Sequence, residues 1–277
     1  MRVFAERRTE VDTLARLSFR RAGPRTVVEA AFATSPLRIL TPRNHGRAAW
    51  AYTSTLGGGL VDGDSVRLRL DVGPGAAAVL ASQGQNRVYR SRRGCHSELT
   101  AQIGEGGFLA LLPDPTVCFA GASYQQRTEL RLAPGAAAVA VEVLASGRSA
   151  RGERWAFRRY QGDLSLRSGD RLLLSERLLL DPAHGSVAER LGRFDALCTL
   201  LVAGESLRAE REELARRIGA LPLRPRADRV EQANELEGGV LVVRIAAVSV
   251  EDALHAVRGH LCFMPHLLGD DPWARRP

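Results

Sequence analysis

Lysine is absent from this sequence, so its cationic side chains other than histidine are all arginines. The 39 arginines outnumber the 31 acidic residues and give a formal net charge of +8 at pH 7. A P-loop is excluded, because the glycine-rich run from Gly57 to Gly63 lacks the Lys-Ser/Thr ending. Since arginine pairs bidentately with carboxylates, the composition favours a partner with an acidic surface.

Cysteine is scarce, and the four positions Cys95, Cys118, Cys198 and Cys262 are far apart. They lack the paired short spacings of a zinc site or of a small secreted disulfide scaffold, so we expect reduced thiols. The first ten residues carry charges and no apolar stretch of a signal peptide. No apolar run approaches the roughly twenty residues of a membrane span. We therefore expect a cytoplasmic protein that does not bind membranes.

Signatures of catalysis are also missing from the sequence. There is no G-x-S-x-G elbow and no G-x-G-x-x-G fingerprint. No nucleophile stands out together with a base and an orienting group. These absences favour a protein that is not an enzyme, and a hydrolase with an unrecognised site stays open as an alternative.

Alternating apolar and polar residues predict a chain made mostly of strands. Val66, Leu68, Leu70 and Val72 alternate with polar residues, which is the period of a half-buried strand. The predicted strands are Ala15–Arg20, Thr26–Ala33, Ala48–Thr55, Ser65–Val72, Ala76–Ser82, Ser97–Ile103, Phe108–Leu112, Tyr124–Leu132, Ala137–Leu144, Leu164–Arg167, Arg171–Leu180, Ala196–Ala203 and Val240–Val248.

Turns between these strands recur at a nearly constant interval. Gly75, Gly106 and Gly135 each lie in a link between two predicted strands, and they are separated by 31 and 29 residues. A repeat of strand pairs near thirty residues indicates stacked or helically wound sheet layers, as in a β-solenoid. Pro-Gly turns are equally common in a plain sandwich. The predicted fold class is mainly β, solenoid-like or sandwich, with two α-helices toward the C-terminus.

The two helices are predicted in the last third of the chain. The first spans Glu205–Ile218 and is mostly polar, which places it at the surface. The second begins at Ser249, which forms a capping-box-like pair with Asp252, and we expect Pro265 to stop it.

The domain organisation follows from this distribution of strands and helices. Hydrophobic residues make up 45% of the 277-residue chain, enough for a sizeable core. We expect one domain over residues 1–277, with a β-rich body at about 14–203 and a helix-containing part at about 204–277. Leu221–Arg226 is the best candidate for a linker within the second part.

The segment from Thr53 to Ser91 joins a glycine-rich run, a strand, a Pro-Gly turn, a second strand and a polar edge. Its runs T-S-T-L-G-G-G-L-V-D-G-D, D-V-G-P-G-A and R-V-Y-R-S resemble the urease accessory protein UreD (UreH) family. Leu111–Ala122 and Glu142–Gly152 are similar to two further family segments, and Pro265–Gly269 is similar to the family's ending.

The resemblance implies a non-enzymatic scaffold for urease maturation. Such a protein holds apo-urease, joins UreF and, through it, the GTPase UreG, and offers nickel an internal route toward the urease active site. By this resemblance the helices dock a UreF-like partner while the sheet body contacts urease. We expect Val139–Leu144 and the apolar face of the last helix to be partner-facing, with no tightly bound cofactor, nickel(II) only in transit, and no nucleic acid.

Candidate residues for partner binding or nickel transit come from the segments that carry the resemblance. Glu142 is a carboxylate inside an apolar strand, where it must face solvent, an arginine or a passing cation. The full set of candidates is Gly57, Gly58, Gly59, Asp62, Gly63, Asp64, Arg87, Tyr89, Arg90, Glu142 and Arg148.

Metal ligands are scattered along the sequence. We expect weak nickel transit only, with Asp64, Glu142 and His266 as candidates. At the C-terminal helix, His260 and Cys262 point to nearly opposite sides, which favours solvated histidines and a core cysteine over a fixed site.

A second function also fits the composition. The charge of +8 and the strand repeat suit a β-rich binding protein for an acidic polymer or nucleic acid. A steep salt dependence of binding to nucleic acid would distinguish that function from the scaffold.

Overall fold

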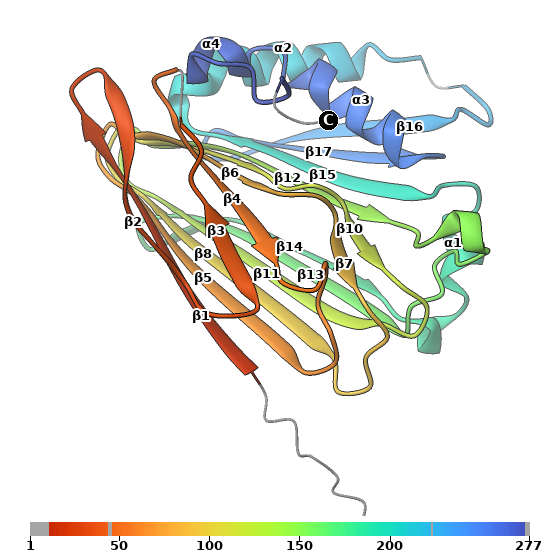
Figure 1. The fold of residues 1–277 in the computed structure, drawn as a ribbon. Coiled ribbons are helices and arrows are strands. Elements are labelled where there is room, and N and C mark those ends of the chain that lie inside the picture. Colours follow the sequence, from red (N-terminus) through yellow and green to blue (C-terminus); the bar gives the residue numbers. More distant parts are fainter. Residues whose placement is uncertain (1–10, 44–45, 223, 275–277) are drawn as a thin grey trace, which may run out of the picture.

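The computed structural model describes residues 11–43, 46–222 and 224–274. The expectation that there is no signal peptide concerns residues 1–10, which lie outside the described residues. Two β-sheets face each other, and helices cover the outer face of one of them (Figure 1). Of the helices described, none is both long and apolar enough to span a membrane.

Seven strands form the first sheet, in the order β14-β13-β11-β8-β5-β1-β2. The neighbours β1, β5, β8, β11 and β13 run parallel, whereas β2 and β14 form antiparallel edges. Their bounds are β1 (Val11–Ala22), β2 (Arg25–Ala33), β5 (Asp64–Val72), β8 (Cys95–Ile103), β11 (Ser123–Leu132), β13 (Arg159–Ser168) and β14 (Arg171–Leu180).

Ten strands form the second sheet. Parallel pairing joins β4, β6, β9 and β12, and the antiparallel strands β15, β17 and β16 continue the sheet beyond β12. Their bounds are β3 (Leu37–Leu40), β4 (Ala49–Thr55), β6 (Ala77–Ser82), β7 (Asn86–Val88), β9 (Phe108–Leu112), β10 (Thr116–Cys118), β12 (Ala137–Ala145), β15 (Ala196–Ala203), β16 (Arg229–Leu236) and β17 (Val240–Ala247). The last two strands lie within the part predicted to carry the helices, so both predicted parts share this sheet.

The chain winds between the two sheets, and this confirms the predicted helical winding. β5, β8 and β11 lie in the first sheet, and each is followed by a strand of the second sheet, β6, β9 or β12. Gly75 and Gly106 both have a φ of 61°, which suits the glycine turn between the sheets. Successive turns stack, because the Gly75 N–H donates to the Glu105 carbonyl at 2.9 Å and the Gly106 N–H to the Pro134 carbonyl at 3.2 Å.

Four α-helices are described: α1 (Val187–Leu191), α2 (Arg208–Gly219), α3 (Val250–His260) and α4 (Met264–Leu268). The two long ones are the predicted helices. Ser249 Oγ accepts a hydrogen bond from the Asp252 N–H at 3.0 Å, which confirms the predicted cap. The prediction that Pro265 stops the second helix is wrong: α3 ends at His260, and Pro265 lies in the first turn of α4, where no backbone donor is needed.

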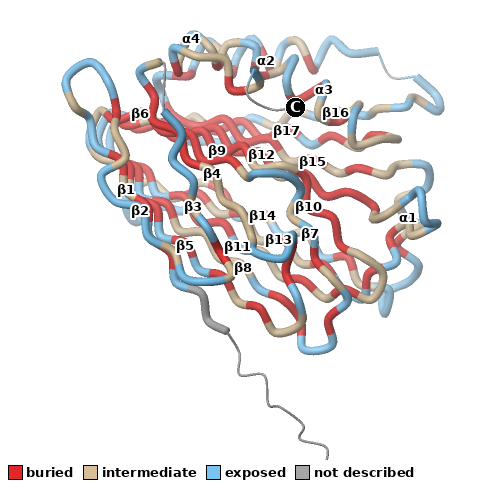
Figure 2. The backbone as a smooth tube through the Cα atoms, viewed as in Figure 1, coloured by how far each residue is buried: buried red, intermediate tan, exposed pale blue. Residues whose placement is uncertain are grey.

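Two hydrophobic layers stabilise the fold. One lies between the sheets and the other between the ten-stranded sheet and α2, α3 and α4, and buried residues dominate this sheet in Figure 2. β12 supplies both layers, with Ala138 and Ala140 in the first and Val139 and Val141 in the second. The expectation that Val139–Leu144 is partner-facing is therefore wrong, since β12 is a central strand between β9 and β15.

Candidate functional site: an inner cavity, an arginine-rich corner and a polar cluster

Glu142 places a carboxylate in the layer between the two sheets. It occupies an inward position of β12, in line with Ala138 and Ala140. Its Oε1 accepts hydrogen bonds from Thr128 Oγ1 at 2.8 Å and Gln126 Nε2 at 2.9 Å. Within the described residues it forms no ion pair, so an arginine is not what balances its charge.

Glu142 lines two cavities. The larger has a volume of about 180 Å³ and extends from Glu142 and Tyr160 to Gly84 and Asp114, beyond the end of β6. The smaller, of about 30 Å³, is also lined by Glu142 and Tyr160 and extends to Glu176. Glu142 and Tyr160 therefore border both cavities.

Neutral polar groups surround the deep part of the larger cavity. Asn86 Nδ2 donates to the Tyr124 hydroxyl at 3.2 Å, and Ser97 Oγ contacts the same hydroxyl. Burial raises the pKa of Tyr124 and of Tyr160, so both phenols stay protonated. Burial also raises the pKa of Glu142, and the hydrogen bonds from Thr128 and Gln126 offset this only in part.

The carboxylate at the far end of the smaller cavity is neutralised. Both oxygens of Glu176 accept hydrogen bonds from Arg244, each at 2.9 Å, in a bidentate pair that joins β14 to β17. Glu142 and Glu176 therefore differ in charge compensation, and only Glu142 remains without a cation.

The glycine-rich run allows the chain to approach β7 closely. A Cβ on Gly59 would lie 2.5 Å from the Arg87 carbonyl oxygen and 2.8 Å from Cε2 of Tyr89. Gly57 and Gly58 lie in the exposed turn after β4. The run thus brings the predicted residues Gly59, Arg87 and Tyr89 together, for reasons of backbone packing.

Two predicted aspartates hold the turn that precedes β5. Asp62 Oδ1 accepts a hydrogen bond from the Arg93 N–H at 2.7 Å, and Gly63 separates it from Asp64. Asp64 is buried, and its Oδ2 accepts from the Val61 N–H at 2.8 Å. Neither aspartate lines the two cavities.

Aromatic and charged side chains meet where β7 and β10 end. Tyr89 and Phe119 pack edge to face with ring centroids 5.1 Å apart, and the Arg148 guanidinium lies 4.2 Å from the centroid of Phe119. Glu153 fixes Arg148 with two hydrogen bonds. The structure thus joins the predicted residues Tyr89 and Arg148 through Phe119 and Glu153, which the sequence patterns missed.

The three nickel candidates are not brought together. Glu142 lies between the sheets, Asp64 holds a turn, and His266 is exposed on α4 in the outer helical layer. Within the described residues, no three His, Cys, Asp or Glu side chains are grouped so as to hold a metal ion. Burial raises the pKa of the Cys95 and Cys118 thiols, which keeps both protonated.

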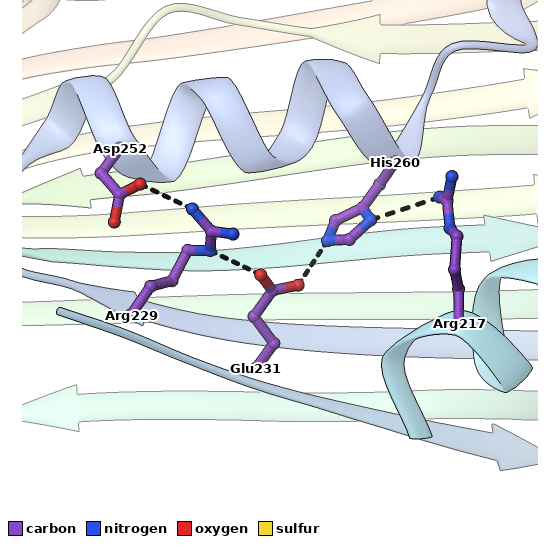
Figure 3. A network of polar contacts seen from close by, with 5 residues as sticks. All are labelled: Arg217, Arg229, Glu231, Asp252 and His260. Atoms are coloured by element: carbon purple, nitrogen blue, oxygen red, sulfur yellow. Dashed lines mark hydrogen bonds and ion pairs between the residues drawn. The ribbon is translucent and has the colours of Figure 1, made fainter. Parts of the chain in front are cut away.

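A polar cluster lies between β16 and the helices (Figure 3). Glu231, whose side chain is 2% exposed, pairs with Arg229 and with His260 Nε2. Arg229 Nη1 donates to Asp252 Oδ1 at 2.6 Å, and Arg217 Nη2 lies 3.4 Å from His260 Nδ1. Although burial alone would raise the pKa of Glu231, its hydrogen bonds with His260 and Arg229 lower it below the usual value.

This cluster corrects the expectation for the C-terminal helix. His260 is not solvated, because its side chain is only 12% exposed, and Cys262 is exposed rather than in the core. No local pattern indicated the cluster, since β16 was not among the predicted strands. The strand lacks strict alternation of apolar residues, and the pairing partner β17 decides its position.

The fold and these sites define a helically wound, two-sheet β-protein with an inner carboxylate cavity and a helical layer on one face. The family model described as UreD urease accessory protein matches residues 12–276, and the chain belongs to this family.

Curated relatives agree with this family. The chain is 47% identical to a urease accessory protein UreD of Sorangium cellulosum, over 94% of this chain and 83% of that protein. It is 38% identical to a urease accessory protein UreD of Anaeromyxobacter, over 95% of this chain and 89% of that protein. It is 29% identical to a urease accessory protein D of Arabidopsis thaliana, over 92% and 97%.

Proposed function

We propose that this protein is a urease maturation scaffold that works in the cytoplasm. It binds apo-urease together with UreF-like and UreG-like partners and gives nickel(II) an internal passage toward the urease active site. Membership of the UreD family supports the link to urease. The protein acts by binding and not by catalysis, so nickel is its cargo and GTP turnover takes place elsewhere in the complex.

The position of Glu142 is the observation that supports the proposed nickel passage. It is a carboxylate that forms no ion pair with any described residue, and it lines two cavities. Hydroxyl, amide and carboxylate oxygens are hard ligands that suit a hydrated divalent cation. One carboxylate among neutral oxygens binds such an ion weakly, and weak binding permits release at the far end.

Protonation of Glu142 is coupled to the passage. Burial raises the pKa of this carboxyl, so the empty cavity favours the protonated form more than water does. An arriving cation favours the ionised form, so the proton leaves as the ion binds. Acid conditions then weaken the interaction of the cation with the cavity.

Activation of urease in cells tests the proposal. Urease subunits co-expressed with the accessory proteins should become active at low nickel only when this protein is present. Equal activation without it would overturn the scaffold function.

A conservative substitution tests the passage within that scaffold. Glu142→Gln keeps the shape of the side chain and the acceptor for Thr128 and Gln126, and it should lower urease activation about tenfold or more at limiting nickel. His266→Ala, on the exposed face of α4, is the matched control and should leave activation nearly unchanged. Greater damage in the His266 variant, with partner binding intact, would contradict the passage at Glu142.

A further inference from the structure

Exposed arginines lie in and next to the loops after β7, β10 and β12, which stack on one another. The Ser91 N–H donates to the Gly121 carbonyl at 3.3 Å, and the Gly121 N–H donates to the Ala156 carbonyl at 3.0 Å. Within the described residues, four of these arginines form no ion pair and no side-chain hydrogen bond, and we call them the arginine corner: Arg87, Arg90, Arg92 and Arg158.

The acids that border the arginine corner are already paired. Asp62 pairs with Arg93 at 3.5 Å, and Glu153 pairs with Arg148. Asp195 likewise pairs with Arg154. The positive charge of the arginine corner is therefore not neutralised by these neighbours.

The loop that presents Arg158 is held in a fixed conformation. Trp155 has a φ of 53°, a strained value for a bulky residue, and its side chain is buried. Its Nε1 donates to the Phe194 carbonyl at 3.0 Å, and Arg154 Nη2 donates to the same oxygen at 2.9 Å. A loop fixed in this way loses little conformational entropy when a partner binds.

We propose that the arginine corner docks an acidic patch on a folded protein. Arginine forks match the geometry of carboxylates, and arginine is enriched in protein interfaces. The inference rests on the proposed function only for the identity of the partner, which would then be the urease apoprotein. Charge attraction at such a surface raises the association rate and makes binding weaken with salt.

An aromatic ring at the arginine corner favours a protein over a nucleic acid as the partner. Phe119 packs edge to face with Tyr89, and the Arg148 guanidinium lies 4.2 Å from its centroid, so the ring is already engaged within the protein. Binding of single-stranded nucleic acid relies on base stacking on aromatic side chains. Carboxylates pair with arginine forks without an aromatic partner.

Charge reversal with a matched control tests the docking surface. The corner variant carries Arg90→Glu, Arg92→Glu and Arg158→Glu. The control variant carries Arg25→Glu, Arg38→Glu and Arg69→Glu, three exposed arginines outside the corner that form no ion pair within the described residues. Both change the net charge equally, and circular dichroism verifies that each full-length variant is folded.

Binding to purified apo-urease is measured at 50 and 150 mM NaCl, and binding to poly-L-glutamate and to a duplex DNA is measured in parallel. The corner variant should bind apo-urease at least about tenfold more weakly than wild type, with a shallower salt dependence, while the control stays within about twofold. Equal affinity of both variants for apo-urease would overturn the docking surface and leave the proposed function standing.

Poly-L-glutamate and duplex DNA separate the test of the docking surface from the test of the proposed function. If wild type does not bind apo-urease, the proposed function fails, and binding to poly-L-glutamate then tests the docking surface. Weaker binding by the corner variant alone supports the docking surface, and equal binding by both variants overturns it. The docking surface is also overturned if wild type binds the duplex DNA more tightly than both apo-urease and poly-L-glutamate at 150 mM NaCl.

Discussion

Glu142 and Glu231 are two carboxylates on the same ten-stranded sheet that face opposite layers of the protein. Glu142 faces the other sheet and accepts hydrogen bonds from a hydroxyl and an amide, and its pKa is raised. Glu231 faces the helices, pairs with Arg229 and His260, and its pKa is lowered. Burial opposes ionisation at both sites, and the presence of cationic partners decides the direction of the shift.

The comparison separates a structural carboxylate from one that weakens the fold. Glu231 joins β16 to α3 and so contributes to the attachment of the helical layer. Glu142 forms no ion pair with any residue that the structure describes, and an ionised carboxylate in that place opposes folding. We therefore expect the two carboxylates to affect stability with opposite signs.

The largest change in the free energy of unfolding is expected at Glu231, in the layer between the ten-stranded sheet and the helices. Glu231→Ala removes the partner of Arg229 and His260 and should lower the free energy of unfolding by about 3 kcal/mol. Urea denaturation followed by circular dichroism measures the change. Glu235→Ala, on the exposed part of the same strand, is the control and should change stability by less than about 0.5 kcal/mol. Equal losses in both variants would mean that the cluster does not stabilise the helical layer.

A change of opposite sign in the free energy of unfolding is expected at Glu142, in the layer between the sheets. Glu142→Gln replaces an ionisable side chain by a neutral one that still accepts both hydrogen bonds, and it should raise the free energy of unfolding by about 1–2 kcal/mol at pH 7. Glu176→Gln weakens the bidentate pair with Arg244 and should be destabilising instead. A destabilised Glu142→Gln protein would show that the ionised carboxylate supports the fold.

A smaller loss is expected at the start of α3. Ser249→Ala removes the cap that receives the Asp252 N–H, and it should lower the free energy of unfolding by about 1 kcal/mol. Because Asp252 also pairs with Arg229, the double variant with Glu231→Ala should deviate from additivity by about 0.5 kcal/mol. Strictly additive losses would show that the cap and the cluster act independently.

The smallest effect expected is the change with pH in what Glu142 and Glu231 contribute to the free energy of unfolding. The folded pKa of Glu142 lies above the ordinary value of 4.5, so the wild type loses stability relative to Glu142→Gln as pH rises above 4.5. The folded pKa of Glu231 lies below 4.5, so its contribution is full above 4.5 and is lost as pH falls. Thermal and urea unfolding between pH 3 and 8 should show opposite slopes of about 0.5 kcal/mol per pH unit. Slopes of the same sign would contradict the assignment of the two shifts.

Much of the fold follows from local patterns in the sequence. Period-two alternation predicted strands such as Ser65–Val72, and the spacing of Gly75, Gly106 and Gly135 predicted the winding. The capping pair at Ser249 predicted the start of α3. These features depend on residues close in the chain, where backbone sterics and alternation fix the local structure.

The candidate site was predictable only in part. Glu142 stood out because a carboxylate interrupts an apolar strand, and the resemblance marked Tyr89 and Arg148. Phe119 and Glu153 were not among the candidates. Phe119 contacts Arg148 from a different loop, and Glu153 contacts it from five residues further along the same loop.

The sequence by itself determined the β-rich fold class, the winding repeat, the two long helices and the family. Tertiary structure decided which of these two carboxylates gains a cation from a distant part of the chain. Arg229 lies two residues before Glu231 on β16, whereas His260 reaches Glu231 because helix packing places α3 against this strand. Within residues 11–43, 46–222 and 224–274 no arginine forms an ion pair with Glu142, and pairing between segments far apart in the chain cannot be deduced from local sequence.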